Sequence, residues 1–498
     1  MWARAGSAAQ DAAVVDVGSN SVRLVIYRLE GRAVWTVFNE KVLAGLGRGV
    51  QTTGRLSPEG VAEALSAIRR FRAVLDAAEP EQVFAVATAA VRDSKDGAEF
   101  VQRIHDQTGL TIRVLSGEEE ARYSALGVIA GCPHAEGVAG DLGGSSLELI
   151  RIGDGEVGTG VTLPLGPFAL GAPAEINPGQ VRKLASKRLD EVADSFRAKT
   201  FHAVGGAWRS LAQIHMAMSD YPLRIVHLYE MSARDAVDAA RFVAKQSRGS
   251  LERMPGLSKK RAETLPYAAC VLEELIEHLG YERLSVSAYG VREGMLIEAM
   301  SSRLRALDPL VEGCAALGGR QGVAEGLGPA LAAWLKPALA ALPPVFEDGR
   351  DTVLLEAACR LADVGARLHP DHRADLAFAQ VLRAPIAGQS HPERAYLAQA
   401  VHSRYGGGAA PEPYAVRRVL TEERVARAKA LGLAMRLGAD LSGRAPELLE
   451  HCALTIARGR LTLAADAAWA DMLLGEQTAK RGQALASALD LQWEAKAA

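Results

Sequence analysis

The segment Asp16-Val17-Gly18-Ser19-Asn20-Ser21-Val22-Arg23 lies between two short β-rich runs, Val14–Val17 and Leu24–Tyr27. Glycine and short polar residues between such runs are typical of a turn that joins two strands. The pattern returns as Asp141-Leu142-Gly143-Gly144-Ser145-Ser146-Leu147-Glu148, again between two β-rich runs. A turn that occurs twice, each time behind an aspartate at a strand end, predicts two lobes of related structure.

The residues around both turns alternate between strand-like and helix-like patterns. After the first turn, Leu56–Ala77 carries apolar residues at helical spacing and opens with Ser57-Pro58-Glu59, a helix cap followed by proline at the first helical position, and Val83–Ala87 is strand-like. After the second turn, the strand-like run Phe201–Val204 leads into the pair Gly205-Gly206. Strands that alternate with helices predict the α/β class.

The chain is expected to divide into three parts. Residues 1–130 and 131–305 should form the two lobes, because each range contains one of the two turns. From about residue 306 the composition becomes rich in Ala and Leu with helical periodicity, as in Glu422–Leu437. We therefore expect residues 306–498 to form a separate, mostly α-helical domain.

Composition excludes several classes of protein. The chain has 57 Lys plus Arg and 59 Asp plus Glu, a formal net charge of −2, which argues against an indiscriminate nucleic-acid binder. A local basic groove could still bind a polyanion. The five cysteines form no CxxC pair, which is typical of free thiols in a reducing compartment. Since neither a signal-peptide core nor an apolar run of about 18 residues is present, we expect a cytoplasmic protein without a membrane span.

The first turn has the chemistry of an anion site. Backbone N–H groups of a glycine turn can approach an anion closely, and the side chains of Ser19, Asn20 and Ser21 add donors beside Gly18. Asp16, at the end of the preceding strand, can hold Mg²⁺ directly or through water. A plain hairpin turn would explain the same residues.

The second turn repeats this chemistry with two carboxylates. Asp141 and Glu148 flank the turn, so the paired strands could direct both at one Mg²⁺ ion. The residues between them, Gly143, Gly144, Ser145 and Ser146, could hold a phosphate as the first turn would. Two acidic turns that face each other across a cleft would bind a Mg²⁺-phosphate from both sides.

Three further segments follow strand-like runs. In Ser116-Gly117-Glu118-Glu119-Glu120-Ala121-Arg122, one glutamate could face the cleft and deprotonate a water, although acidic residues also simply complement a helix dipole. In Ala87-Thr88-Ala89-Ala90-Val91-Arg92, Thr88 and Arg92 suit phosphate binding. Gly205 could contact a ligand or serve only close strand–helix packing.

These segments together resemble the exopolyphosphatase / guanosine pentaphosphate phosphohydrolase (Ppx/GppA) family. The motifs that carry the resemblance are DVGSNSVRL, ATAAVR, SGEEEAR, DLGGSSLEL, AVGGAW and SAYGVREGML, in the family's order between residue 14 and about residue 300. The resemblance implies the actin-like ATPase fold, in which two ribonuclease-H-like lobes flank a cleft. It also implies a degenerate HD domain at residues 306–498, because Ala362 precedes Asp363 where longer members have His.

The resemblance assigns roles to individual residues. It implies that Glu119 is the catalytic base, that Asp141 and Glu148 bind the metal, and that the two turns hold phosphates. Arg23 and Arg92 resemble the family's phosphate-binding arginines, and Arg261 resembles a basic residue that some members present to a longer substrate. Ser145 departs from the family's usual GGGS turn, which predicts a slightly reshaped turn.

The function implied is Mg²⁺-dependent, processive removal of the terminal phosphate from inorganic polyphosphate by a homodimer, with a monovalent cation such as K⁺ left open. The nearest alternative is a guanosine pentaphosphate (pppGpp) phosphohydrolase with the same site. A sugar or acetate kinase of the same superfamily would leave the SGEEEAR segment without a role. A filament or chaperone protein that uses nucleotide as a switch is disfavoured by Glu119 and by the helical C-terminal region.

Overall fold

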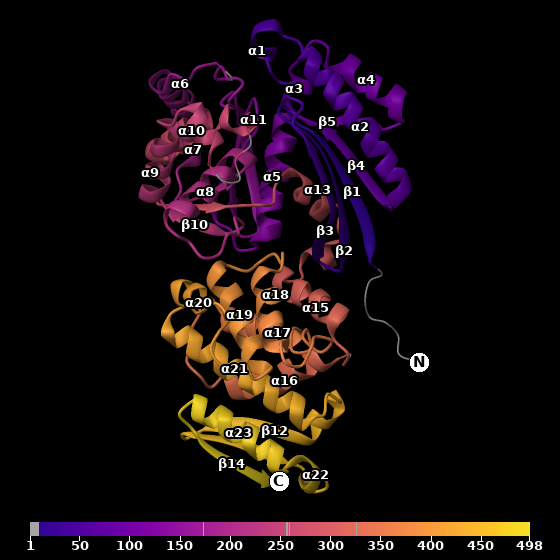
Figure 1. The fold of residues 1–498 in the computed structure, drawn as a ribbon, viewed down its shortest axis with the longest axis vertical. Coiled ribbons are helices and arrows are strands. Elements are labelled where there is room, and N and C mark those ends of the chain that lie inside the picture. Colours follow the sequence, from indigo (N-terminus) through magenta and orange to yellow (C-terminus); the bar gives the residue numbers. More distant parts are fainter. Residues whose placement is uncertain (1–8, 173, 255–256, 258, 325) are drawn as a thin grey trace. The chain divides into compact units, whose positions relative to one another are not determined.

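The structure is a computed structural model that describes residues 9–498, except 173, 255, 256, 258 and 325. The chain forms two compact units, of which the first ends at Ala306 and the second is Leu307–Ala498 (Figure 1). None of the helices in the described ranges has the length and apolar character needed to cross a membrane.

The first sheet is a five-stranded sheet with the order β3-β2-β1-β4-β5. Its strands are β1 (Gln10–Val17), β2 (Val22–Glu30), β3 (Ala33–Val42), β4 (Gln82–Ala87) and β5 (Arg113–Val114). Strands β1, β2 and β3 pair antiparallel, whereas β4 joins β1 and β5 joins β4 in parallel. The helices of this part are α1 (Val50–Thr53), α2 (Pro58–Ala78), α3 (Ala89–Arg92), α4 (Gly97–Thr108) and α5 (Gly117–Gly131).

The second sheet repeats this order and adds one strand, giving β8-β7-β6-β9-β11-β10. Its strands are β6 (Gly137–Leu142), β7 (Leu147–Gly153), β8 (Glu156–Leu163), β9 (Thr200–Val204), β10 (Tyr229–Ser232) and β11 (Arg283–Val286). An antiparallel β6–β7–β8 meander followed by parallel β9 and β11 matches β1–β5 strand for strand. The predicted α/β class and the duplicated, ribonuclease-H-like lobes are therefore confirmed.

Nine helices are described between β6 and the end of the first unit. They are α6 (Pro178–Asp190), α7 (Ala193–Phe196), α8 (Gly206–Met218), α9 (Ala233–Ala244), α10 (Arg248–Glu252), α11 (Lys259–Ala262), α12 (Leu265–Leu279), α13 (Val291–Ala299) and α14 (Ser302–Arg305). Local sequence explains where helices of both lobes start: Ser57 accepts a hydrogen bond from the Gly60 N–H at the start of α2, and Asn177 accepts one from the Gln180 N–H at the start of α6.

Helices α5 and α13 each pack on the sheet of the other lobe. Residues Ala121, Ala125 and Val128 of α5 pack on Ile150 and Ile152 of the second sheet. In contrast, α13 packs on the first sheet through Leu296, which joins the cluster of Ala12, Val14 and Val25. The expected ranges 1–130 and 131–305 therefore describe the two sheets but not these two helices, which each cover the sheet of the other half.

The α5–α13 contact requires glycine. A Cβ on Gly127 would lie 2.2 Å from the Gly290 carbonyl oxygen, and a Cβ on Gly294 would lie 1.9 Å from the Tyr123 carbonyl oxygen. Side chains at these positions would push the helices apart. The close contact fixes the first turn of α5 between the two sheets, where Glu120 lies.

The second unit is mostly helical, as predicted. Its helices are α15 (Pro309–Gln321), α16 (Leu327–Leu339), α17 (Arg350–Arg360), α18 (Arg373–Arg383), α19 (His391–Arg404), α20 (Pro413–Val419), α21 (Glu422–Leu441), a 3₁₀ turn (Pro446–His451), α22 (Ala470–Leu473) and α23 (Glu476–Ala488). A three-stranded sheet, β12 (Cys452–Ala457), β13 (Arg460–Ala465) and β14 (Gln492–Ala497), was not expected. Asp363 accepts hydrogen bonds from the backbone N–H groups of Val323 and Ala324 at 2.7 and 3.1 Å.

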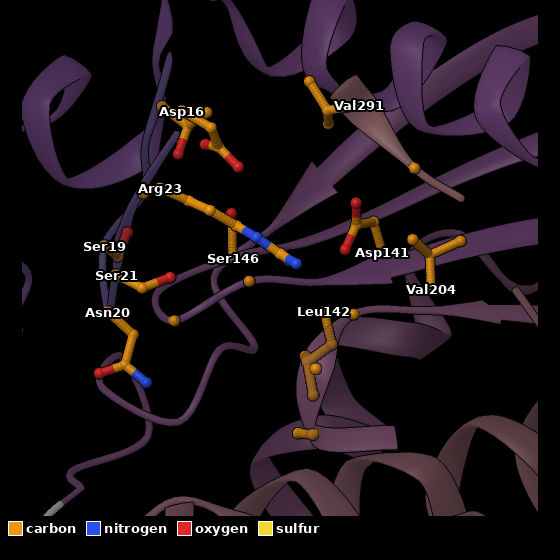
Figure 2. A pocket seen from close by; sticks show the side chains of 18 of the residues that line it. Asp16, Ser19, Asn20, Ser21, Arg23, Asp141, Leu142, Ser146, Val204 and Val291 are labelled. Carbon is orange, nitrogen blue, oxygen red and sulfur yellow. The ribbon is translucent and has the colours of Figure 1, made fainter. Parts of the chain in front are cut away.

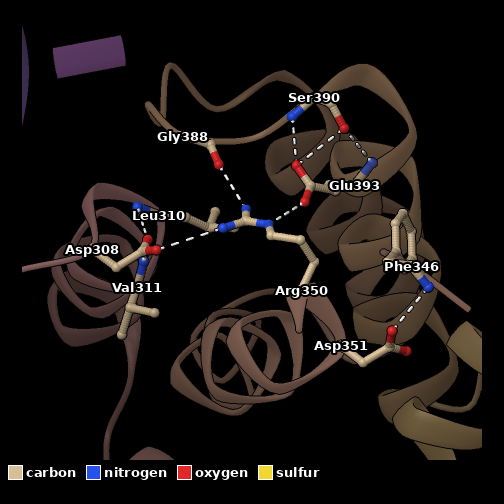
Figure 3. Close-up of polar contacts among 9 residues, drawn as sticks. All are labelled: Asp308, Leu310, Val311, Phe346, Arg350, Asp351, Gly388, Ser390 and Glu393. Atoms are coloured by element: carbon tan, nitrogen blue, oxygen red, sulfur yellow. Dashed lines mark hydrogen bonds and ion pairs between the residues drawn. The ribbon is translucent and has the colours of Figure 1, made fainter. Parts of the chain in front are cut away.

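Arg350 connects three segments of the second unit (Figure 3). Its Nε donates to Glu393 at 2.6 Å, its Nη2 donates to the Gly388 carbonyl at 2.9 Å, and its Nη1 lies 3.6 Å from Asp308. Asp308 caps α15, and Glu393 forms the capping box of α19 with Ser390. One guanidinium group thus holds the starts of α15 and α19 beside the start of α17.

We expect Arg350→Met to lower the free energy of unfolding by about 3 kcal/mol, because it leaves the buried Glu393 carboxylate without its cation. The measurement is urea unfolding of the full chain, with hydrogen exchange of α19 to locate the loss. Arg383→Met is the matched control, since it removes an exposed pair with Glu412 and should cost less than about 1 kcal/mol. Equal losses in both variants would contradict the prediction.

Candidate active site

A pocket between the two lobes collects most of the predicted site residues (Figure 2). The predicted residues that line it are Asp16, Gly18, Ser19, Asn20, Ser21, Arg23, Thr88, Asp141, Gly143, Gly144, Ser146, Gly205 and Arg261. Four predicted residues are not part of its lining: Arg92, Glu119, Ser145 and Glu148. Further lining residues are Lys41, Glu120, Arg209, Gly290, Val291 and Arg292.

The two glycine turns have the same backbone structure. The Gly18 N–H donates to the Ser21 carbonyl at 2.9 Å, and the Gly143 N–H donates to the Ser146 carbonyl at 2.9 Å. The turns lie against each other, since a Cβ on Gly144 would be 2.9 Å from the Ser19 Cβ. The predicted pair of facing turns is therefore present in one pocket.

Ser145 does not reshape the second turn in the way expected. It is not among the residues with positive φ, so its Cβ causes no backbone strain there. Instead its carbonyl accepts from the Gly166 N–H at 3.3 Å, and a Cβ on Gly166 would lie 2.4 Å from the Ser145 backbone. The backbone of the turn is supported by the chain that follows β8, and the Ser145 hydroxyl lies against Gly47 of the first lobe, where a Cβ would be 2.9 Å from its Oγ.

Asp141 and Glu148 are direct cross-strand partners on β6 and β7, so their side chains point to the same face of the sheet. Ser124 of α5 donates a hydrogen bond to Asp141 Oδ2. Glu148 is 1% exposed, and both of its carboxylate oxygens lack a hydrogen-bond partner within the described structure. Burial raises the pKa of Asp141 and raises that of Glu148 well above its usual value, in the latter case helped by the charge of Glu120.

Asp16 has a different environment, although its position on β1 matches that of Asp141 on β6. It stands opposite Arg23 in the β1–β2 pair, as Asp141 stands opposite Glu148. Its Oδ2 accepts from Arg292 Nη1 of α13 at 2.8 Å. Asp16 is thus held by a cation from α13, and Figure 2 shows Arg23 reaching from its strand into the pocket towards Asp141.

The first turn of α5 separates its glutamates. Glu119 forms a capping box: its carboxylate accepts from the Ser116 N–H at 2.8 Å, and its N–H donates to Ser116 Oγ at 3.1 Å. It also pairs with Arg113 and stays partly exposed, outside the pocket. The next residue, Glu120, is buried and lines the pocket. The expectation that Glu119 faces the reacting atoms is therefore corrected, because its side chain turns back to cap its own helix.

Glu120 is held by Arg92, the residue expected to bind phosphate. Arg92 Nη1 donates to Glu120 Oε2 at 3.1 Å and to the Leu115 carbonyl at 3.1 Å. Arg92 itself lies outside the pocket lining, so its expected phosphate contact is corrected to a contact with this carboxylate. Burial raises the pKa of Glu120 to about 7, against the lowering effect of Arg92.

Cations line the other part of the pocket. These are Arg23, Lys41, Arg209, Arg261 and Arg292. Arg261 lies over the start of α8, where a Cβ on Gly206 would be 2.5 Å from its Nη2. Burial lowers the pKa of Arg209 and Arg261. The pocket lining therefore has carboxylates at Asp16, Glu120 and Asp141, and its five cations outnumber them.

The sequence analysis did not predict four of the residues that line the pocket, namely Lys41, Glu120, Arg209 and Arg292. For some of them the sequence contains a signal that could have found them. The spacing Ser116-x-x-Glu119 is the capping-box signature and could have excluded Glu119. Arg292 lies within the quoted motif SAYGVREGML, and Arg209 directly follows AVGGAW. No sequence pattern indicates Lys41 as a pocket residue, because it reaches the pocket only through the pairing of β3 with β2.

The pKa of Glu120 makes a prediction for stability. Its pKa in the fold, about 7, lies above the ordinary 4.5, so the folded chain keeps a proton that the unfolded chain releases. Its contribution to the free energy of unfolding is complete below about 4.5 and is lost as pH rises to about 7. We expect Glu120→Gln to gain stability relative to wild type between pH 5 and pH 8 in urea unfolding. An unchanged difference between the two proteins would contradict this.

Among the residues that the structure describes, no group of three or more His, Cys, Asp or Glu side chains could hold a metal ion. The described residues therefore contain no metal site in which three or more such side chains would be the ligands. The carboxylate oxygens of Glu148, beside Asp141, and the neighbouring Ser146 hydroxyl are buried without a hydrogen-bond partner in the described structure, and the same hydroxyl is near enough to Glu148 to lower its pKa against the effect of burial.

Family comparisons cover both units. A family model described as the Ppx/GppA phosphatase family matches residues 25–303, and a second, described as the C-terminal part of exopolyphosphatase, matches residues 328–492. One relative is Exopolyphosphatase 2 of Mycobacterium tuberculosis strain H37Rv. It is 27% identical over 310 residues, which are 57% of this chain and 97% of that protein.

Solved structures resemble more than half of the chain. An Aquifex aeolicus PPX-GPPA enzyme has 26% sequence identity and a TM-score of 0.51 over 58% of this chain and 99% of its own. An exopolyphosphatase from Cytophaga hutchinsonii shares the fold at 23% identity, with a TM-score of 0.54 over 58% of this chain and 96% of its own.

Proposed function

Because this chain belongs to the Ppx/GppA phosphatase family, we propose that it is an exopolyphosphatase, which hydrolyses the terminal phosphoanhydride bond of inorganic polyphosphate. The observation that carries the proposal is the pocket itself. It combines two glycine turns, whose backbone N–H groups and hydroxyls can bind phosphate oxygens, with a buried carboxylate that has a pKa of about 7. The cations that line the pocket can bind the rest of an anionic chain.

We propose Glu120 as the general base, in place of Glu119. A base works best when its pKa is close to the working pH, and Glu120 meets this condition because it is buried. Arg92 orients the carboxylate through Oε2, which leaves the other oxygen to accept a proton from a water. General-base catalysis of this kind contributes roughly 10²–10⁴-fold in rate.

The phosphate positions follow from the turns. Backbone N–H groups and hydroxyls of Gly18–Ser21 and Gly143–Ser146 would hold the terminal phosphate, and Thr88 lines the same pocket. Because the two turns touch, one phosphate can contact both lobes. Donors fixed in this way stabilise the charge that develops as the phosphoryl group is transferred.

We propose that Asp141 and Glu148 hold Mg²⁺. The residues fit such an ion, because the Glu148 oxygens are buried without donors and Mg²⁺ commonly uses one or two carboxylates together with waters and substrate phosphates. When bound, the ion would neutralise charge on the phosphate oxygens. Asp16 is a weaker candidate than expected, since Arg292 already occupies one of its oxygens.

The cations suggest how a long chain stays bound. Arg23, Lys41 and Arg209 can attract the phosphates that follow the terminal one, so that the chain would move inward after each cut without leaving the pocket. This supports the expectation of processive hydrolysis. It would appear as the absence of intermediate chain lengths when long polyphosphate is partly digested.

The experiment that tests the proposal is release of orthophosphate from long-chain polyphosphate by the purified full chain. We expect release with Mg²⁺ and none with excess chelator. Guanosine pentaphosphate (pppGpp) is assayed alongside, and release from it alone would assign the sister activity to the same pocket. Release from neither compound would overturn the proposed function.

Two further expectations from the family resemblance remain proposals. We propose that the protein is a homodimer, which light scattering on the full chain would test by its mass relative to 52.8 kDa for one chain. We also propose that a monovalent cation such as K⁺ assists, which phosphate release with and without K⁺ at constant ionic strength would test.

A further inference from the structure

Arg404 is a buried cation of the second unit. It is the last residue of α19, a helix that packs against both α18 and α21 (Figure 1), and only 4% of it is exposed. Its Nε has no hydrogen-bond partner, and among the residues that the structure describes no acid forms an ion pair with it. Buried polar groups are almost always hydrogen-bonded, and a buried charge is costly unless it is paired. Packing alone therefore does not explain this arginine.

Another buried arginine of the same helix has the contacts of a structural residue. Arg394 Nη1 donates to the carbonyl oxygens of Leu382 and Ala384, at the end of α18. The helix dipole favours a cation at the position of Arg404, but within the described ranges no carbonyl accepts a hydrogen bond from its side chain. The two arginines are both buried, and they differ in whether the fold supplies an acceptor.

A second arginine lies against the same aromatic ring as Arg404. The guanidinium carbon of Arg404 lies 5.1 Å from the centre of the Tyr405 ring, and that of Arg373 lies 5.7 Å from it. The Nε of Arg373 also lacks a hydrogen-bond partner. The ring is fixed, because the Tyr405 hydroxyl donates to the Ala362 carbonyl at 3.0 Å and accepts from the Gly365 N–H at 2.8 Å. A rigid ring thus holds two guanidinium groups whose Nε atoms have no acceptor.

The acids that act on the charge of Arg404 are bound to other arginines. Asp363 lies 3.6 Å from Arg444 Nε and also accepts from two backbone N–H groups. Asp440 accepts from Arg481 Nε at 2.7 Å and lies 3.8 Å from Arg436 Nε. With the two arginines at the ring, five arginines stand against two aspartates, an excess of three positive charges. The missing negative charge would come from a ligand.

The ligand that fits this cluster is a phosphate group. The planar guanidinium fork donates two parallel N–H bonds to phosphate oxygens, which makes arginine the preferred residue for such recognition. A phosphate dianion would offset most of the excess charge. The exposed fraction falls from 32% for the Arg444 side chain and 26% for that of Arg436 to 4% for Arg404. This decrease favours a small free ion over a long chain.

We propose that the second unit binds a free phosphate ion at Arg404, with Arg373 and Arg444 as further contacts. The ion supplies the charge that the cluster lacks, and it accounts for a buried arginine without an acceptor. The inference involves residues of the second unit only and does not rest on the proposed function.

The experiment measures hydrogen exchange of the amides at the end of α19 in the full chain, in orthophosphate and in chloride of equal ionic strength. With orthophosphate at about ten times its dissociation constant, exchange in wild type should slow about tenfold. Arg404→Met should abolish this slowing, and Arg383→Met, which removes an exposed arginine of the same unit, should keep it. Phosphate bound in the pocket of the first unit would act equally on all three proteins.

Urea unfolding without phosphate distinguishes a binding residue from a structural one. Arg404→Met should have a urea midpoint at least as high as that of wild type, because it removes a buried charge that has no acceptor. Arg394→Met should lower the midpoint, because two backbone carbonyls lose their donor. Equal losses in the two variants would overturn the inference, since Arg404 would then have a partner in the fold.

The inference is also overturned if orthophosphate does not slow exchange in wild type, if chloride slows it equally, or if Arg404→Met keeps the effect. Tripolyphosphate is tested alongside, and a stronger effect than that of orthophosphate would overturn the assignment to a single free ion. Arg404→Lys serves where the methionine variant does not fold. It keeps the charge but not the planar fork and should bind orthophosphate about tenfold more weakly. Phosphate release from polyphosphate does not enter the test, so a failure of the proposed function would leave its outcome unchanged.

Discussion

Replacing Glu120 by glutamine is expected to lower the rate of phosphate release by about 10²–10⁴-fold with little change in KM. Glutamine keeps the shape and can still accept the hydrogen bond from Arg92, but it cannot take a proton from water. The loss should therefore appear in kcat. The measurement is initial-rate phosphate release from long-chain polyphosphate at saturating Mg²⁺.

Glu119→Gln is the matched control, one residue away in the same helix turn. Its carboxylate caps the helix and pairs with Arg113 outside the pocket. We expect it to cost about 0.5–1 kcal/mol of stability and to change kcat by less than about threefold. If Glu119→Gln abolished activity and Glu120→Gln did not, the assignment of the base would return to Glu119.

Replacing Glu148 by glutamine is expected to lower activity by about 10²-fold or more and to remove stabilisation by Mg²⁺. Glu148 is buried with both oxygens unpartnered, which is costly for a carboxylate without a cation. The metal-free variant should therefore be at least as stable as wild type. Wild type alone should gain thermal stability as Mg²⁺ is added, since a ligand that binds only the folded state stabilises it.

The control for this variant is Glu156→Gln, an exposed glutamate at the start of β8. It should keep both activity and the Mg²⁺-dependent shift in the melting temperature. A shift that persists unchanged in Glu148→Gln would place the metal elsewhere. A metal-free Glu148→Gln protein much less stable than wild type would mean that the carboxylate has a partner in the fold.

Local sequence predicted the parts of the fold that depend on neighbours in the chain. Each strand–turn–strand unit is a short-range structure, so the turns at Gly18–Ser21 and Gly143–Ser146 and the pairing of Asp141 with Glu148 followed from alternation and turn chemistry. The Ser57 cap of α2 is local in the same way. The small sheet formed by β12, β13 and β14 was missed, because the helix α23 lies between β13 and its parallel partner β14.

What the sequence by itself determined is the duplicated α/β fold and the identity of most predicted residues that line the pocket, because these lie in two short, repeated segments. What only the tertiary structure decided is which of the candidate side chains reach the pocket. The exchange of α5 and α13, made possible by Gly127 and Gly294, brings Glu120 between the lobes while Glu119 turns outward. Strand register alone brings Lys41 beside Arg23. Contacts between distant segments depend on packing across the whole fold, and no local pattern contains them.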